Sequence, residues 1–239
     1  MGLSFEELGF RATPIGDLSL RRRRELSLGV DVIEIKLGDE FLMSSLFTVS
    51  EIALADLALK KLDSDNLDIV VGGLGLGYTA QAVLQHKSVG SLVVVDALEA
   101  VIDWHQSGLL PLGPELTADK RCKFQLGDFF ALSASSNGFD QSVPSRKYDA
   151  ILVDIDHSPE FLLNAQNGVF YQPAGLKQLA SHLKPGGIFG LWSNDLADDV
   201  FTERLDKIFA KVWAEPVTFH NPLQDKDFTQ TVYLAQTAS

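Results

Sequence analysis

Four glycines between an apolar run and a helical pattern limit most strongly what this chain can fold into. The stretch IVVGGLGLGYTAQAVL contains Gly72, Gly73, Gly75 and Gly77. Glycine lets the backbone turn sharply and lie close to a ligand, and the free N–H groups at the start of a helix attract anions. Nineteen residues after Gly77, Asp96 ends the next apolar run, where a carboxylate accepts hydrogen bonds from ribose hydroxyls. The combination predicts a site for an adenosine-type ligand.

The spacing of these glycines separates dinucleotides from simpler nucleosides. The dinucleotide fingerprint G-x-G-x-x-G fails, because Tyr78 stands where its last glycine belongs. This favours a ligand without a pyrophosphate, such as an adenosine that carries an amino acid. The GDFF stretch follows the third predicted strand, so that Asp128 can accept from an adenine amino group and Phe129 can pack on the ring. Plain core packing is the alternative for Phe129.

Apolar runs and helical stretches alternate through the second part of the chain. Five short apolar runs predict strands that helices cover on both faces, at 67–71, 91–95, 122–126, 148–153 and 187–192. Helical stretches are expected at 78–85, 97–104, 173–183 and 199–212. This alternation predicts an α/β fold with a doubly wound parallel sheet. The loop between the runs 214–220 and 229–236 is too short for a crossover helix, so the last strand should be antiparallel.

The first part of the chain has the pattern of a small β-structure. Strands are expected at 17–25, 30–37 and 41–47, because tight-turn residues separate these runs. Thr48 and Glu51 have the spacing of a capping box and predict a helix over about 52–61. The chain therefore divides into an N-terminal β-hairpin region, 1–49, and an α/β domain, 50–239.

Charge and composition argue against several classes of protein. The formal net charge of −12 repels phosphate backbones and disfavours nucleic-acid binding. For the basic run Arg21–Arg24 we expect a solvated strand face or a subunit contact, with a phosphate or RNA site as the alternative. No uncharged apolar run approaches the ~18–20 residues of a membrane span, and the acidic N-terminus is unlike a signal peptide. The single Cys122 fits a reducing cytoplasm, where we expect the protein to act on a small molecule.

Six stretches carry a further pattern: FLMSSLFTVSE, the glycine loop, VVVDALEAVI, RCKFQLGD, YDAILVDIDHSP and LKPGGIFGLWS. Together they resemble the spermidine synthases (aminopropyltransferases), a branch of the class I S-adenosylmethionine-dependent methyltransferase superfamily. The resemblance implies a Rossmann-like, seven-stranded sheet that ends in a β-hairpin. It also implies S-adenosyl-L-methionine, or its decarboxylated form, bound at these residues: Gly72, Gly73, Gly75, Gly77, Asp96, Ala97, Asp128 and Phe129. The N-terminal β-hairpins of such chains suggest a homodimer.

The chain departs from the spermidine synthase pattern at three places. The family typically has GGGDGG in the glycine loop, and Gly75 occupies the place of its aspartate. Losing that negative charge removes a repulsion against the carboxylate of intact S-adenosylmethionine. The family's strand end reads D-S-S-D-P, and Asp154 matches its first acid. His157 stands at the position of the second acid, and Asp156 lies one residue before that position. The tyrosine–histidine pair expected in the first helix is missing from 51–59.

The ends of the predicted parallel strands gather candidates for the chemistry. Transfer from a sulfonium to an amine needs alignment and removal of a proton. His157 is the preferred base, with Asp154 or Asp156 orienting the amine, and the alternative is a histidine that bonds its own loop. Trp192 and His220 are candidates for substrate contact. The remaining histidines, expected at the surface and without metal-ligand spacing, are His86, His105 and His182.

These patterns favour a transferase that moves a methyl group from S-adenosylmethionine to a small acceptor, for which an amine is one candidate. Two alternatives stay open. One is a polyamine aminopropyltransferase that uses decarboxylated S-adenosylmethionine. The other is a non-catalytic nucleoside-binding module whose altered Asp154–His157 segment no longer supports catalysis.

Overall fold

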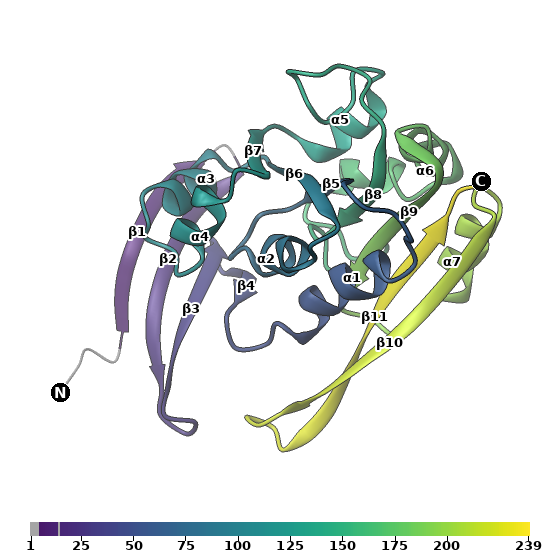
Figure 1. Cartoon of the computed structure of the whole chain (residues 1–239). Coiled ribbons are helices and arrows are strands. Elements are labelled where there is room, and N and C mark those ends of the chain that lie inside the picture. Colours follow the sequence, from purple (N-terminus) through teal and green to yellow (C-terminus); the bar gives the residue numbers. More distant parts are fainter. Residues whose placement is uncertain (1–4, 14) are drawn as a thin grey trace.

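The chain folds around two β-sheets, seen in a computed structural model that describes residues 5–13 and 15–239. In Figure 1 the small N-terminal sheet stands on one side of the molecule and the yellow C-terminal hairpin on the other. The large sheet has the strand order β10–β11–β9–β8–β5–β6–β7. Its strands are β5 (Leu67–Gly72), β6 (Val89–Asp96), β7 (Cys122–Leu126), β8 (Tyr148–Val153), β9 (Leu183–Ser193), β10 (Lys211–Asn221) and β11 (Lys226–Gln236).

The strand directions of the large sheet agree with the predicted pattern. Strand β5 pairs in parallel with both β6 and β8, and β8 pairs in parallel with β9. Strand β11 is antiparallel to β9 and to β10, as the short loop between the last two strands required. The central strands are buried on both faces, which explains their nearly continuous apolar sequences. The prediction of an α/β fold with a mostly parallel seven-stranded sheet and a C-terminal antiparallel hairpin is confirmed.

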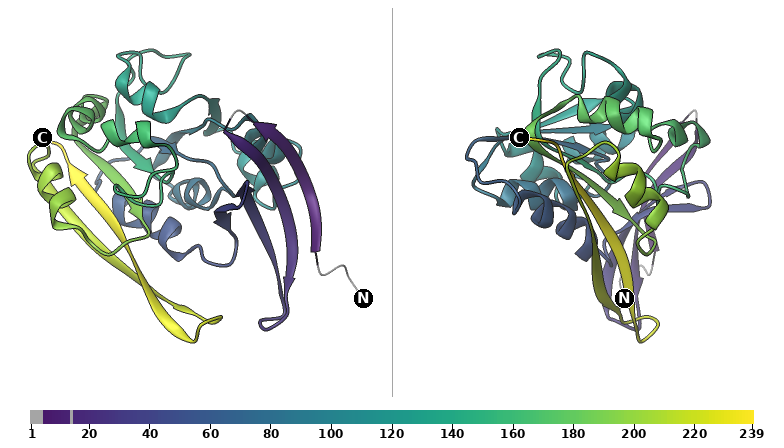
Figure 2. Two further views of the ribbon diagram at one scale, coloured as in Figure 1. Left: turned by 180° about the vertical axis from the view of Figure 1, so that it is seen from behind. Right: turned by 90° about the vertical axis from the view of Figure 1, so that its right-hand side faces the viewer.

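Helices cover both faces of this sheet, as Figures 1 and 2 show. One face packs against α1 (Val49–Leu59), α2 (Tyr78–Gln85), α3 (Glu99–Gln106) and α4 (Gly113–Ala118). The other packs against α5 (Phe129–Ala134), α6 (Pro173–Ala180) and α7 (Asp199–Asp206). A 3₁₀ helix, η1 (Ala165–Val169), follows β8. The short elements α4, α5 and η1 were not predicted, because a single helical turn has too few residues to show a period.

The small sheet contains one strand more than predicted. Its order is β1 (Phe5–Thr13), β2 (Gly16–Glu25), β3 (Val30–Leu37) and β4 (Glu40–Ser44), all antiparallel neighbours. Helix α1 begins at Val49, and the division of the chain into 1–49 and 50–239 stays a prediction.

The basic run of β2 is neutralised within this sheet. Arg21 and Arg23 each place their Nε 2.8 Å from a carboxylate oxygen of Glu34, which is 2% exposed. Arg22 pairs with Glu6, and Arg24 pairs with Asp31. Because acids already match all four guanidinium groups, the run offers little net charge to a phosphate backbone.

The capping box predicted at the start of α1 is wrong. Thr48 makes no side-chain capping bond, and the Glu51 carboxyl lies instead 2.9 Å from the Ser50 hydroxyl. Glu51 lies one helical turn before Leu54 and Ala55, on the face that α1 buries against the sheet. Glu51 is in the first turn of α1, and its side chain lines a cavity instead of completing a capping box.

Candidate active site

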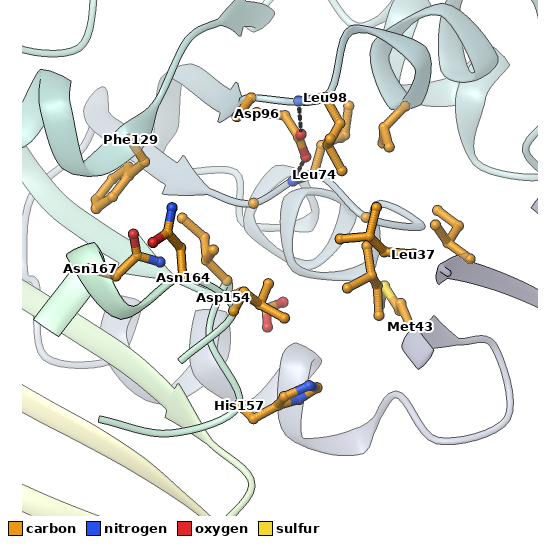
Figure 3. Close-up of a pocket in the computed structure, with 18 of the residues that line it drawn as sticks. Leu37, Met43, Leu74, Asp96, Leu98, Phe129, Asp154, His157, Asn164 and Asn167 are labelled. Atoms are coloured by element: carbon orange, nitrogen blue, oxygen red, sulfur yellow. Dashed lines mark hydrogen bonds between the residues drawn. The ribbon is translucent and has the colours of Figure 1, made fainter. Parts of the chain in front are cut away.

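A cavity of about 690 Å³ lies at the carboxyl ends of β5, β6 and β8, with β3 and β4 of the small sheet closing one side. Figure 3 shows Phe129, Asn164 and Asn167 on one side of this cavity and Leu37 and Met43 on the other. Open α/β sheets bind ligands at this edge, and the volume suits a ligand of nucleoside size together with a second small molecule.

The glycine loop lies against the cavity in a conformation that other residues rarely adopt. Gly73 has φ +93°, and a Cβ there would collide with the Asp154 carbonyl. Gly75 has φ +47°, and a Cβ there would lie 2.7 Å from the Met43 sulfur. Met43 therefore packs in the space that a side chain at position 75 would need.

Two histidines expected at the surface are buried instead. His105 is 0% exposed, and its Nε2 lies 3.0 Å from the Gly75 carbonyl, so that it supports the glycine loop from behind. His182 is buried and lies 2.9 Å from the Ser133 carbonyl through Nε2. Burial lowers the pKa of both rings, which keeps them neutral.

Asp96 ends β6 beside the glycine loop, as predicted. Its Oδ2 accepts from the Leu74 N–H at 2.8 Å and its Oδ1 from the Leu98 N–H at 2.8 Å. Burial raises the pKa of Asp96, while these N–H groups favour its ionised form. Asp96 thus fixes the loop conformation and also lines the cavity with the exposed Ala97. Its contact with a ribose stays a prediction.

Asp128 and Phe129 lie at the start of α5 and also reach the cavity. The Asp128 carboxylate caps α5 by accepting from the N–H groups of Phe130 and Ala131. Phe129 is 2% exposed and stacks on Phe139 with ring centroids 4.9 Å apart. Core packing therefore accounts for most of the Phe129 ring.

Two amides at the same end of the cavity were missed at the sequence level. Asn164 and Asn167 line the cavity near Phe129, from the segment that contains η1. The sequence of this polar loop has no hydrophobic periodicity, so nothing in it indicates that the loop lies beside the cavity.

Asp154 and Glu51 form a pair of buried carboxyl groups in the cavity wall. Asp154 accepts from the Thr79 hydroxyl at 2.7 Å, and burial raises its pKa to about 6. Burial, together with the nearby charge of Asp154, raises the pKa of Glu51 to about 8. At neutral pH the pair as a whole therefore carries one negative charge.

Glu51 and its surroundings are the main functional feature that the sequence reading missed. The Ser50 hydroxyl contacts Glu51 and also accepts from the Trp192 indole N–H at 2.9 Å, which places Trp192 beside the pair. The signal was present, because Glu51 is three and four residues before Leu54 and Ala55 on a buried helix face.

The side chains of the two predicted site residues in the loop after β8, Asp156 and His157, point in different directions. His157 lines the cavity, with Nε2 3.1 Å from a carboxylate oxygen of Glu40 in β4. Asp156 is 1% exposed and points away, where it accepts from the Leu163 N–H at 2.7 Å and the Tyr171 hydroxyl at 2.9 Å. Asp156 organises its own loop, and its contact with an amine stays a prediction.

Of the two residues predicted to contact substrate, one lies at the cavity. Trp192 lines it from the end of β9. His220 lies near the tip of the β10–β11 hairpin, exposed and beside Asp225 and Asp227. The hairpin extends past the sheet edge (Figure 1), which carries His220 away from the site.

Two features are absent from the described ranges, 5–13 and 15–239. They contain no group of three or more His, Cys, Asp or Glu residues arranged to hold a metal ion. In the same ranges no helix has the length and apolarity needed to cross a bilayer.

Comparison with known proteins decides the family. Residues 48–221 match the spermine/spermidine synthase domain. The chain belongs to this family. The match runs from the start of α1 to the end of β10, and so includes the glycine loop, Asp96 and Asp154. Family membership confirms the predicted spermidine-synthase-like transferase, and it agrees with S-adenosylmethionine or its decarboxylated form as the donor.

Two solved structures share the fold. A spermidine synthase in complex with the transition state analogue AdoDATO superposes with a TM-score of 0.73 at 15% identity, over 97% of this chain and 74% of that one. The spermidine synthase of Thermotoga maritima gives a TM-score of 0.69 at 16% identity, over 97% and 72%. The small N-terminal sheet, which lies outside the family match, is included in this coverage.

Proposed function

We propose that this chain transfers an aminopropyl group from decarboxylated S-adenosylmethionine to the nitrogen of a small amine. The observation that carries the proposal is the family match over the segment that holds the glycine loop and Asp154. The family supports aminopropyl transfer better than the methyl transfer favoured by the sequence reading. The fit of the site is a second support, because the glycine loop, Asp96 and Asp128 surround a cavity large enough for a nucleoside and an acceptor.

The donor supplies an alkyl carbon bonded to a positively charged sulfur. In the proposed reaction the amine nitrogen forms a bond to that carbon, and the carbon–sulfur bond breaks with its electron pair going to sulfur. The proton lost from nitrogen passes to the Asp154 carboxylate. With its pKa raised to about 6, this group is ionised at neutral pH and basic enough to accept the proton.

Asp154 is a better candidate base than His157. The Nε2 of His157 is already engaged by Glu40, whereas one oxygen of Asp154 is held by Thr79 and the carboxylate lines the cavity. We therefore assign proton removal to Asp154 and place His157 at the cavity wall, bridging to the small sheet.

The test is a product analysis. The purified protein is incubated with an amine mixture and either decarboxylated or intact S-adenosylmethionine, and the nucleoside products are separated by chromatography. Methylthioadenosine from the decarboxylated donor is the expected product. Absence of both methylthioadenosine and S-adenosylhomocysteine across the amine mixture would remove the proposal.

One observation favours methyl transfer as a second candidate. Gly75 leaves the glycine loop without an acid, and the Met43 sulfur packs where such a side chain would stand. A loop without that charge does not repel the carboxylate of intact S-adenosylmethionine. Formation of S-adenosylhomocysteine in the same experiment would select this candidate.

A further inference from the structure

The charged side chains of the cavity are few, and most already have a partner. Asp96 is bonded to two backbone N–H groups and Asp128 caps α5. His157 is bonded to Glu40. Within the described part of the chain the cavity lining contains no Lys or Arg. Asp96 and Asp128 keep their charges at the ends of β6 and β7, and the remaining negative charge of the cavity wall is that of the Glu51–Asp154 pair.

Hydrogen bonds around Ser50 support a single charge on that pair. The Ser50 hydroxyl lies 2.5 Å from Gln230 Oε1, while the Gln230 amide nitrogen donates to Asn194. In this amide orientation the one Ser50 hydrogen goes to Gln230, and Trp192 donates to the Ser50 oxygen. The remaining contact, between the Ser50 oxygen and Glu51, is then a hydrogen bond only if the Glu51 carboxyl is protonated and donates to that oxygen.

The groups that titrate around Glu51 come from three directions. Asp154 faces it from the end of β8, and Tyr78 faces it from α2. His157 lines the same cavity from the loop after β8. A tyrosine is neutral at pH 7, so Asp154 sets the charge at this point of the wall.

A second part of the cavity is apolar. The side chains opposite Asn164 and Asn167 come from β3, β4 and the start of α3, and Figure 3 shows Leu37, Met43 and Leu98 among them. We call this part the apolar lobe, and its members are Ile35, Leu37, Leu42, Met43, Leu98 and Val101. Ile35 and Met43 are cross-strand partners, so the lobe is continuous across β3 and β4. A charged group placed here would lose its hydration without gaining a partner.

We propose, on the basis of the proposed function, that the acceptor is a primary monoamine whose remaining atoms are apolar, with its nitrogen at Asp154 and its apolar portion in the apolar lobe. The ammonium of a decarboxylated donor already balances the single charge of the carboxyl pair. A diamine would bring another ammonium into a lobe that has no acid. A hydrocarbon chain instead gains from leaving water there.

Competing acceptors test this inference directly. The ratio kcat/KM is measured for 1-aminohexane and 1,4-diaminobutane with each donor. We expect 1-aminohexane to be preferred at least tenfold. A preference for 1,4-diaminobutane, or equal values, would overturn the inference.

Two variants on the same strand provide a matched pair. Leu37→Glu places an acid in the lobe and should shift the preference toward 1,4-diaminobutane by at least tenfold. Val30→Glu changes an exposed position of β3 outside the cavity and should leave the preference unchanged. An equal shift in both variants would contradict the role of the lobe, and the wild-type amine series stands if Leu37→Glu does not fold.

The inference about the acceptor can also be tested if the protein shows no transferase activity. If no amine gives product with either donor, binding of the two amines to the wild-type protein is measured by calorimetry with methylthioadenosine present. Tighter binding of 1-aminohexane supports the lobe as an amine site, and tighter or equal binding of 1,4-diaminobutane refutes it.

Discussion

Replacing Glu51 by glutamine should change how stability depends on pH. The folded protein raises the Glu51 pKa from 4.5 to about 8, so between these values it binds more protons than the unfolded chain does. The free energy of unfolding therefore falls as the pH rises through this window. At about 1.4 kcal/mol for each tenfold change in proton affinity, the full effect is roughly 5 kcal/mol above pH 8.

A glutamine has nearly the same shape and stays neutral, so Glu51→Gln should remove this penalty. The free energy of unfolding of the variant minus that of the wild type should therefore grow from pH 5 to pH 9. We expect this difference to grow by up to about 5 kcal/mol. Guanidinium denaturation at the two pH values measures the difference. Glu203→Gln, at an exposed position of α7, is the control and should show no such gain. If Glu51→Gln keeps the wild-type pH dependence, Glu51 does not hold a proton in the folded protein.

Three further changes probe the other parts of the site. Asp154→Asn should lower kcat at least a hundredfold, whereas His157→Ala should lower it less than tenfold; equal losses would show that the base is misassigned. In the wild type, kcat should rise with pH through about 6 as Asp154 ionises, and a flat profile from pH 5 to 7 would contradict that role. Asp96→Ala should weaken methylthioadenosine binding at least fivefold by calorimetry, and unchanged affinity would exclude Asp96 from the nucleoside site.

The parts of the fold that could be predicted are those with a local signal. The runs that became β5 and β8 are apolar because both faces of each strand are buried, and the glycine loop is readable because its φ angles suit glycine. These features place Asp96 and Asp154 at one edge of the sheet from the sequence alone. Helix caps also follow local chemistry, since the Asp198 carboxylate caps α7 by accepting from the Val200 and Phe201 N–H groups.

What could not be predicted depends on contacts between distant segments. Thr48 and Glu51 satisfy a capping pattern, but packing of α1 on the sheet outweighs a bond worth about 1 kcal/mol. Neighbouring residues Asp156 and His157 point in different directions because the loop after β8 folds back on Tyr171. His105 is buried because the glycine loop lies over it, a contact that spans thirty residues of sequence.

The cavity is built from two sheets that are far apart along the chain. Its glycine loop and carboxylates at the strand ends belong to the large sheet, whereas the apolar lobe takes most of its side chains from the small one. On the proposed function, donor recognition is encoded by residues 72–157 and acceptor recognition largely by residues 35–47. A mutant library confined to 35–42, which leaves out Met43 beside the glycine loop, would then sample new acceptors while the nucleoside contacts stay as they are.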